Sequence, residues 1–327
     1  MDRSGYVAVV GGINMDIQGR STGAFRPGDS NPGSAFMSPG GVGRNVAENL
    51  VRLGIRTELV AVLGDDSLSA ALAESCGRLG IGLRGAMRLS QTAASQYLCL
   101  LDDSGALVGA VAAMDSIERL TPERLAERSG LLDGAAMVVA DANLPAATLA
   151  WLAERYGGEG EGSRPGRRGP LLVLDPVSVA KAAKAVDLVG SFAFAKPNRA
   201  EAEVLSGLAI ASRDDLPAAA AALRAKGLGQ AFVSMGREGL YYEGVGASGL
   251  LERGFVRPPA LPVANVSGAG DAALAALVWG QLSDYTIKER AALASAAAAL
   301  AASAPTTVSP DMGAARLLEL AKGVVHE

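Results

Sequence analysis

Short apolar runs, each ending in polar or glycine residues, recur along most of the chain. They lie at residues 6–14, 57–66, 135–143, 171–178, 192–198 and 231–236. Stretches with the spacing of amphipathic helices, such as residues 121–132 and 214–227, separate most of them. The runs are continuous rather than alternating, which indicates strands buried on both faces of a mainly parallel sheet. Repeated alternation of such strands with helices predicts a doubly wound α/β fold.

Two segments, residues 16–39 and 93–116, break this alternation. The first is rich in turn residues and has little helical period, and the second contains two strand-like runs around a turn at residues 102–105. An Asp-Asp-Ser-Gly turn between apolar runs is a good hairpin signal. We therefore predict that both segments form a small β-sheet that lies over the ligand crevice as a lid. Since neither an internal repeat nor a clear linker is found, we predict a single domain over residues 1–327.

Polar residues follow several of the expected strands. In doubly wound folds, ligands bind beyond the carboxyl ends of the strands. That rule gathers six side chains around one crevice: Asn14, Asp141, Asn143, Asp175, Asn198 and Ser234. Any one of them alone would be an ordinary strand-ending residue, whereas six together indicate a binding site.

Composition narrows the chemistry. The chain of 327 residues is 49% apolar and has a formal net charge of −4 with no segregated basic block. This charge distribution disfavours nucleic acid as a partner. The chain has one histidine, His326, which disfavours histidine-dependent nucleophiles, metal cages and general bases. Acid–base chemistry is thereby left to carboxylates or lysines.

The sequence gives little indication of a membrane span, a signal peptide or a disulfide framework. The longest apolar block, residues 291–304, is rich in alanine and shorter than the ~20 residues of a membrane span, so we expect a buried helix. The apolar stretch near residue 10 is too short for a signal peptide. Cys76 and Cys99 are too few for a disulfide framework or a zinc site. We therefore expect a soluble, cytoplasmic protein that does not associate with membranes.

A cluster of small residues, Gly-Ala-Gly at 268–270, precedes Asp271 at the start of a stretch with helical character. Ser267 or Asp271 alone could cap such a helix, so capping does not require the glycines. Small residues leave backbone N–H groups accessible at the positive end of a helix, which is how proteins bind phosphate. The negative charge of an acid disfavours phosphate binding. An acid at this position is explained if it removes a proton from the hydroxyl that attacks the phosphate.

A second glycine cluster lies at residues 40–43 and lets the backbone approach a ligand. It precedes a predicted amphipathic helix with Val46, Leu50 and Leu53 on its core face. The cluster lacks the dinucleotide fingerprint, because Val46 stands where a third Gly or Ala is needed. No stretch matches the P-loop pattern or the catalytic loop of protein kinases.

These motifs carry a resemblance to a known family. The stretch GGVGRNVAENLVRLG at 40–54 resembles the first signature of the ribokinase-like (PfkB) carbohydrate and nucleoside kinases, and NVSGAGDA at 265–272 resembles the second. The elements between them also follow the family's order, so the resemblance covers nearly the whole chain. Within the family, the chain is most similar to the pseudouridine kinases, through segments such as LDPVS at 174–178 and KPNRAEAEVLSG at 196–207.

The resemblance implies roles for individual residues around the phosphate and the acceptor. Asp271 corresponds to the catalytic base, which takes a proton from the acceptor hydroxyl. An anion hole corresponds to the backbone N–H groups of Asp271 and of the three residues before it, Gly268, Ala269 and Gly270. The implied substrate-binding residues are Asn14, Asp16, Gly41 and Asn45, with Asn143 as a further candidate.

The resemblance also implies a nucleotide site. Asn198 and Glu201 match a motif that organises Mg²⁺ and phosphate, with Glu201 acting on the metal through water. Asn198, Ser234 and Gly236 are the implied nucleotide-binding residues. Asn265 stands where many members of the family carry Asp in a loop that holds a monovalent cation, which leaves a K⁺ requirement open.

Simpler roles remain open on local sequence. Asp271 could only balance the charge of its helix N-terminus, and Glu201 could be an ordinary acid of a first helical turn. Asn14 and Asp16 could form a turn. Asn143 could lie near the crevice without touching a substrate.

The resemblance as a whole implies an ATP- and Mg²⁺-dependent pseudouridine kinase that phosphorylates the 5′-hydroxyl of its nucleoside. Another ribonucleoside or sugar kinase of the family is an alternative, because the match is thinnest in the predicted lid. A non-catalytic sugar- or nucleotide-binding regulator is a second alternative. Relatives commonly form dimers through the lid, so a homodimer is expected.

Overall fold

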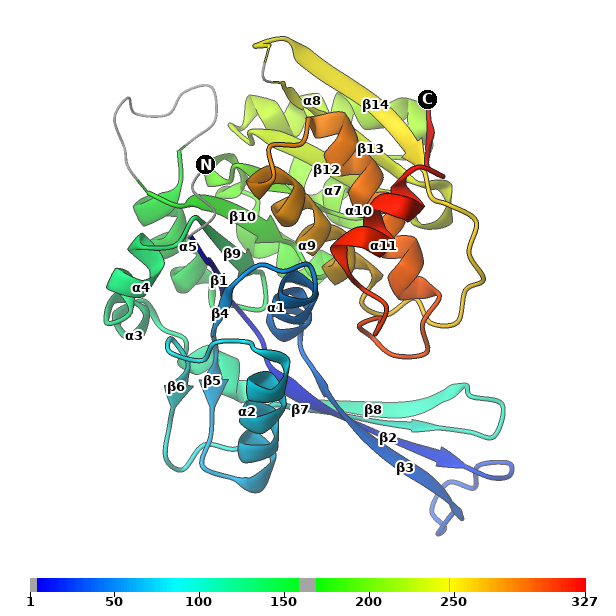
Figure 1. Cartoon of the computed structure of the whole chain (residues 1–327). Coiled ribbons are helices and arrows are strands. Elements are labelled where there is room, and N and C mark those ends of the chain that lie inside the picture. The colour runs from blue at the N-terminus through cyan, green and yellow to red at the C-terminus, as the bar shows by residue number, and fades with distance from the viewer. Residues whose placement is uncertain (1–4, 159–168, 247) are drawn as a thin grey trace.

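The computed structural model describes residues 5–158, 169–246 and 248–327. A nine-stranded sheet runs through its centre (Figure 1). In spatial order its strands are β15 (Val325–His326), β14 (Leu251–Arg257), β13 (Leu240–Val245), β12 (Gln230–Ser234), β11 (Phe194–Ala195), β10 (Leu171–Asp175), β9 (Met137–Asp141), β1 (Val7–Val10) and β4 (Thr57–Val60). The strands from β12 to β4 pair in parallel, which confirms the predicted α/β sheet. The antiparallel strands β13, β14 and β15 are not anticipated by the sequence pattern.

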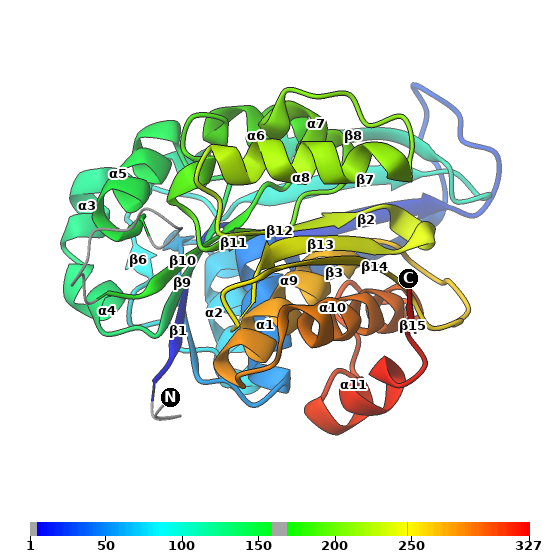
Figure 2. The same ribbon diagram turned by 90° about the horizontal axis from the view of Figure 1, so that it is seen from above.

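Helices cover both faces of this sheet, as Figure 2 shows. One face carries α1 (Val42–Arg52), α2 (Ser67–Leu79), α9 (Ala269–Leu282), α10 (Ile287–Ala302) and α11 (Ala314–Ala321). The other carries α3 (Pro122–Ala126), α4 (Ser129–Asp133), α5 (Ala146–Tyr156), α6 (Val179–Ala182), α7 (Arg199–Ser206) and α8 (Leu216–Ala225). In β1, Val7 and Val9 pack on the first face, and Ala8 and Val10 on the second. Both faces of the strand are therefore buried, as its continuous apolar run predicts.

Two smaller sheets complete the fold. One is the pair β5 (Val62–Leu63) and β6 (Met87–Arg88); the other has four strands, β3 (Gly33–Gly40), β2 (Asn14–Ser21), β7 (Gln96–Leu101) and β8 (Leu107–Ala113). The four-stranded sheet projects from the body of the molecule (Figure 1) and exposes large apolar side chains, among them Phe36, Met37, Leu107 and Val111. It confirms the small sheet predicted from residues 16–39 and 93–116. Its role as a lid and the single-domain division stay predictions.

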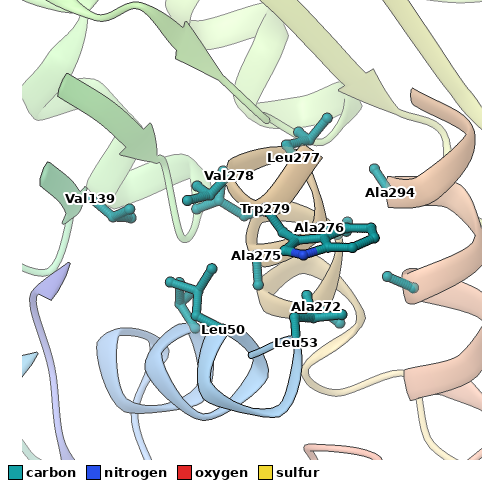
Figure 3. Packing of buried hydrophobic residues seen from close by; sticks show 14 of the residues in the cluster. Leu50, Leu53, Val139, Ala272, Ala275, Ala276, Leu277, Val278, Trp279 and Ala294 are labelled. Atoms are coloured by element: carbon teal, nitrogen blue, oxygen red, sulfur yellow. The ribbon is translucent and has the colours of Figure 1, made fainter. Parts of the chain in front are cut away.

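Helix α9 is buried on every side from Ala272 to Gly280. Figure 3 shows Leu50 of α1 and Leu53, the residue that follows α1, beside α9, with Ala294 of α10 on another side of it. The alanine-rich block 291–304 forms most of α10 and is largely buried, as expected. Within the described residues, no helix is long and apolar enough to cross a membrane.

One charged side chain of α10, Arg290, lies inside this apolar core and is only 1% exposed. Its guanidinium lies over the rings of Phe194 and Phe232, 4.6 and 5.2 Å from their centroids. It donates hydrogen bonds to the carbonyl oxygen of Leu277 at 3.3 Å and to the side chain of Gln281. Burial lowers the pKa of Arg290 to about 9.

Candidate active site

The carboxyl ends of the parallel strands meet at one edge of the large sheet, and polar residues gather there. Asp141 ends β9, Asp175 ends β10, and Lys196 follows β11 directly. All three side chains are at most 5% exposed. The edge therefore holds several charges that are largely removed from water.

The N-terminus of α9 is open to an anion. Its N-cap residue is Gly268, and none of the described side chains caps the helix, so Ser267 does not fill this role. In the described part of the chain, the N–H groups of Gly270 and Asp271 have no hydrogen-bond acceptor. Gly268 has φ 79°, and a Cβ there would lie 2.0 Å from the carbonyl oxygen of Thr307. Uncapped amides at a helix N-terminus fit a phosphate group.

Asp271 lies in the first turn of α9, and its Oδ2 accepts a 2.9 Å hydrogen bond from Nδ2 of Asn45 in α1. Burial is the main reason that the pKa of Asp271 is raised to about 7, and repulsion by Asp175 and Asp141 adds to it. The bond from Asn45 and the charge of Lys196 act in the opposite direction. A carboxyl group that exchanges its proton near neutral pH is suited to general base catalysis.

Asn14 and Asp16 lie where the chain enters the small sheet. Nδ2 of Asn14 donates a 2.6 Å hydrogen bond to Oδ1 of Asp16, and burial raises the pKa of Asp16. A Cβ on Gly40 would lie 2.2 Å from Oδ2 of Asp16, so the carboxylate needs a glycine opposite it. Gly41 has φ 99° and begins α1 as its N-cap, where a Cβ would lie 2.5 Å from the carbonyl oxygen of Gly12. The predicted substrate residues Asn14, Asp16 and Gly41 therefore lie within one tightly packed junction.

Asp141 is a buried acceptor for three backbone amides. Its Oδ2 accepts from Gly12 at 2.7 Å and from Gly43 at 3.0 Å, and its Oδ1 accepts from Asn143 at 2.9 Å. Burial raises the pKa of Asp141 to about 6. Asp141 thus joins β9 to the β1 loop and to the start of α1, and it places Asn143 beside the junction. The sequence places Asp141 in the crevice but does not reveal this role.

Asn198 and Glu201 cap α7 reciprocally. Oδ1 of Asn198 accepts from the N–H of Glu201 at 3.0 Å, while Glu201 accepts from the N–H and the side-chain amide of Asn198 at 2.8 and 2.7 Å. Both carboxylate oxygens of Glu201 are therefore engaged. The described residues contain no group of three or more Asp, Glu, His or Cys that could hold a metal ion. They fit Mg²⁺ only if water and phosphate supply most of its ligands.

The other predicted nucleotide residues lie beside this cap. The N–H of Ser234 donates to the carbonyl oxygen of Pro197 at 2.9 Å, which joins the end of β12 to the segment before α7. Gly236 begins a short 3₁₀ turn (Gly236–Glu238), has φ 58° and is exposed. Asn198, Ser234 and Gly236 therefore lie together at the carboxyl ends of β11 and β12.

Lys196 has no role assigned from the sequence, although the structure places it centrally. Its Nζ lies 3.4 Å from the position that a Cβ on Gly270 would take. Its positive charge lowers the pKa of Asp175, Glu201 and Asp271. A lysine that directly follows a buried strand is the only sequence signal for this position. The uncapped amides of α9 thus have a buried cation beside them, as a phosphate site needs.

A carboxyl group that exchanges its proton near neutral pH, beside uncapped helix amides and a buried lysine, is suited to moving a phosphoryl group onto a hydroxyl. The fold and the site define a phosphotransferase that acts on an alcohol group.

The chain belongs to the pfkB family of carbohydrate kinases, whose family model matches residues 4–312. It is 33% identical to the pseudouridine kinase of Escherichia coli over 320 residues, 98% of this chain and 97% of the relative. It is 34% identical to an uncharacterised sugar kinase of the same organism, YeiI, over 96% of this chain and 83% of the relative. The Arabidopsis thaliana ribokinase complexed with ribose and ATP is 20% identical, with a TM-score of 0.82 over 97% of this chain and 99% of that one. The family predicted from the two glycine motifs is confirmed.

Proposed function

We propose that this protein is a pseudouridine kinase, which uses ATP and Mg²⁺ to phosphorylate the 5′-hydroxyl of pseudouridine. The observation that carries the proposal is the contact between the two glycine motifs: Asn45 of the first donates to Asp271 of the second, beside the uncapped amides of α9. Similarity to the E. coli pseudouridine kinase over nearly the full length of both chains supports the choice of substrate.

The proposed chemistry rests on Asp271 as the base. Its ionised carboxylate accepts the proton of the 5′-hydroxyl while the hydroxyl oxygen forms a bond to the γ-phosphorus and the bond from that phosphorus to ADP breaks. The N–H groups of Gly268, Ala269, Gly270 and Asp271 donate to the charge on the transferred group, that of Ala269 in place of its 3.4 Å bond to the carbonyl oxygen of Val266. Lys196 adds a positive charge beside them. ATP bound with Mg²⁺ supplies the phosphoryl group. Preorganised donors of this kind contribute about 3 kcal/mol each in known oxyanion holes.

The remaining predicted residues divide into two groups. Asn14, Asp16, Gly41, Asn45 and Asn143 are proposed to bind the nucleoside. Asn198, Ser234 and Gly236 are proposed to line the nucleotide site, and Glu201 to act on Mg²⁺ through water, since Asn198 already engages its carboxylate oxygens. A monovalent cation such as K⁺ is a further candidate near Asn265, whose side chain accepts from the N–H of Ser267 at 3.0 Å.

The small sheet supports a proposed homodimer. Phe36 and Met37 of β3 are 63% and 65% exposed, and Leu107 and Val111 of β8 are 60% and 62% exposed. Apolar side chains gathered on one projecting sheet favour contact with a second copy of the chain. Cys76 and Cys99 are unpaired, which suits a reducing compartment, and we place the enzyme in the cytoplasm.

The test is ADP release by the purified protein with ATP and Mg²⁺, across pseudouridine, uridine, other nucleosides and ribose. Turnover confined to pseudouridine and lost in Asp271→Asn is the expected result. Turnover of ribose or another nucleoside would retain a kinase and reject pseudouridine as its substrate. ATP binding without turnover of any acceptor would favour a regulator that has kept the fold. Omitting Mg²⁺ or K⁺ from the assay tests each cation separately.

A further inference from the structure

Helix α1 contains a buried ion pair that the proposed chemistry does not use. Arg44 and Glu48 are 6% and 5% exposed, and Nη2 of Arg44 lies 2.5 Å from Oε2 of Glu48. The other oxygen of Glu48 accepts from Nε and Nη2 of Arg52 at 2.8 and 2.7 Å. Arg52 is partly exposed, so Glu48 is held between a buried and a more accessible guanidinium. A buried ion pair is weak evidence for stability, because desolvation offsets its attraction.

The buried guanidinium has a second contact, which leads to the active site. Nη1 of Arg44 donates a 3.2 Å hydrogen bond to Oδ1 of Asn45. The other end of the same amide, Nδ2, donates to Oδ2 of Asp271 at 2.9 Å. A side-chain amide has one accepting and one donating end, whereas a guanidinium can only donate. Arg44 is therefore compatible with one orientation of Asn45, the one that directs the NH₂ group toward the carboxylate.

We propose that Arg44 is a positioning residue for the reaction: held by Glu48, it fixes the amide of Asn45 so that its NH₂ group faces the base Asp271. The inference rests on the proposed function, in which Asp271 accepts the proton. With the amide reversed, an oxygen would face the carboxylate and repel it. In this proposal Arg44 acts through Asn45.

The charged groups around this relay come from several elements. Asp271 is faced by Asp141 from β9, Asp175 from β10 and Lys196 after β11. Arg44 is also near Asp16 of β2, whose pKa its charge lowers, and Cys76 of α2. Substitution of Arg44 leaves Asp141, Asp175 and Lys196 in place. A change in the pKa of Asp271 therefore reports on its hydrogen bond from Asn45.

The experiment compares Arg44→Met with Arg52→Met. Both remove a guanidinium that pairs with Glu48, but only the first removes the donor to Asn45, so the second is the matched control. The ¹³C signal of the Asp271 carboxyl carbon, assigned by its loss in Asp271→Asn, is titrated in the ligand-free protein. The acid limb of kcat/KM is measured on the same variants with the best acceptor found.

We expect Arg44→Met to move the titration of Asp271 and the acid limb upward by about one pH unit, the effect of losing a hydrogen bond to a charged group. Arg52→Met should leave both where they are in the parent protein. In an Asn45→Ala background, Arg44→Met should cause no further displacement. Because Arg44→Met leaves Glu48 with one partner, the pair Arg44→Met/Glu48→Gln removes both buried charges and should show the same displacement.

Equal titration curves for Arg44→Met, its double variant and the parent protein would overturn the proposal, as would an equal displacement in Arg52→Met. The carboxyl titration needs no turnover and therefore tests the positioning contact by itself. Absence of turnover in the parent protein counts against the proposed function only. A loss of melting temperature without a displaced titration would assign Arg44 a purely structural role.

Discussion

The raised pKa of Asp271 predicts a steep dependence of activity on pH. The carboxyl group accepts a proton only when ionised, and its pKa is about 7 because of burial and repulsion by Asp175 and Asp141. The ionised fraction is then about 0.9 at pH 8 and about 0.1 at pH 6, so kcat/KM should fall roughly tenfold over that interval. Below pH 6 it should fall a further tenfold per pH unit. An ordinary aspartate, with a pKa of about 3.9, would give no loss in this range.

The assay is ADP release at subsaturating acceptor and saturating nucleotide between pH 5.5 and 9, at constant ionic strength. Asp271→Asn should lower kcat by about 10²–10⁴, the usual contribution of a general base, with a much smaller effect on KM. It should also abolish the acid limb. A limb that persists in Asp271→Asn belongs to another group, such as Asp141, whose pKa is raised to about 6. A flat profile from pH 8 to pH 6 in the parent protein would refute the reasoning.

Three further predictions follow from the same geometry. Gly268→Ala should lower kcat at least 100-fold and destabilise the protein, because its Cβ would meet a backbone carbonyl. The control is Gly207→Ala, which has φ 78° but open space around it and should lower the free energy of unfolding, measured by chemical denaturation, by only roughly 1 kcal/mol. Asp271→Asn should raise the melting temperature at pH 8 but not at pH 4. A carboxyl group whose pKa is raised in the folded state makes the protein less stable as pH rises from about 4 to about 7, and the variant removes this loss, which is at most about 4 kcal/mol of unfolding free energy. Phe36→Glu should convert a dimer to a monomer in light scattering, while Leu250→Glu, at least as exposed but in the bend before β14, should not. An unchanged mass in Phe36→Glu would reject the small sheet as the interface.

The parallel strands could be predicted because burial on both faces leaves a continuous apolar run. In β9, residues 137–141 are all buried, and the sequence shows four apolar residues before the final Asp. The antiparallel strand β14 has only two consecutive buried residues, Phe255 and Val256, and contains a glycine and two arginines, so its sequence resembles a loop. Strand β15 pairs with β14 across about 70 residues, and no local signal reports such a contact.

Site residues could be predicted where the backbone needs an unusual conformation that favours glycine. Site residues that are buried charges could not be predicted. Gly41 and Gly268 stand out in the sequence, and the structure gives both a positive φ. Lys196 and Arg44 do not stand out, because lysine and arginine are normally exposed. Arg44 lies on α1, which packs against α2 and against α9 from a distant part of the sequence. The family resemblance assigned Asn45 and Asp271 to the site, but the contact between them spans 226 residues and no local signal predicted it.

The buried guanidinium of Arg290 has a consequence for the direction in which the proposed base points. From Ala272 to Gly280 helix α9 is apolar all round, so hydrophobic packing of this stretch alone would tolerate several rotations of the helix about its own axis. The bonds from Arg290 to Leu277 and Gln281 are satisfied in one rotational register only. Buried polar groups set the register of packed helices in several proteins even where they add little stability. Asp271 lies on the same rigid helix, less than two turns before Leu277, so the register set deep in the core also determines where its carboxylate faces.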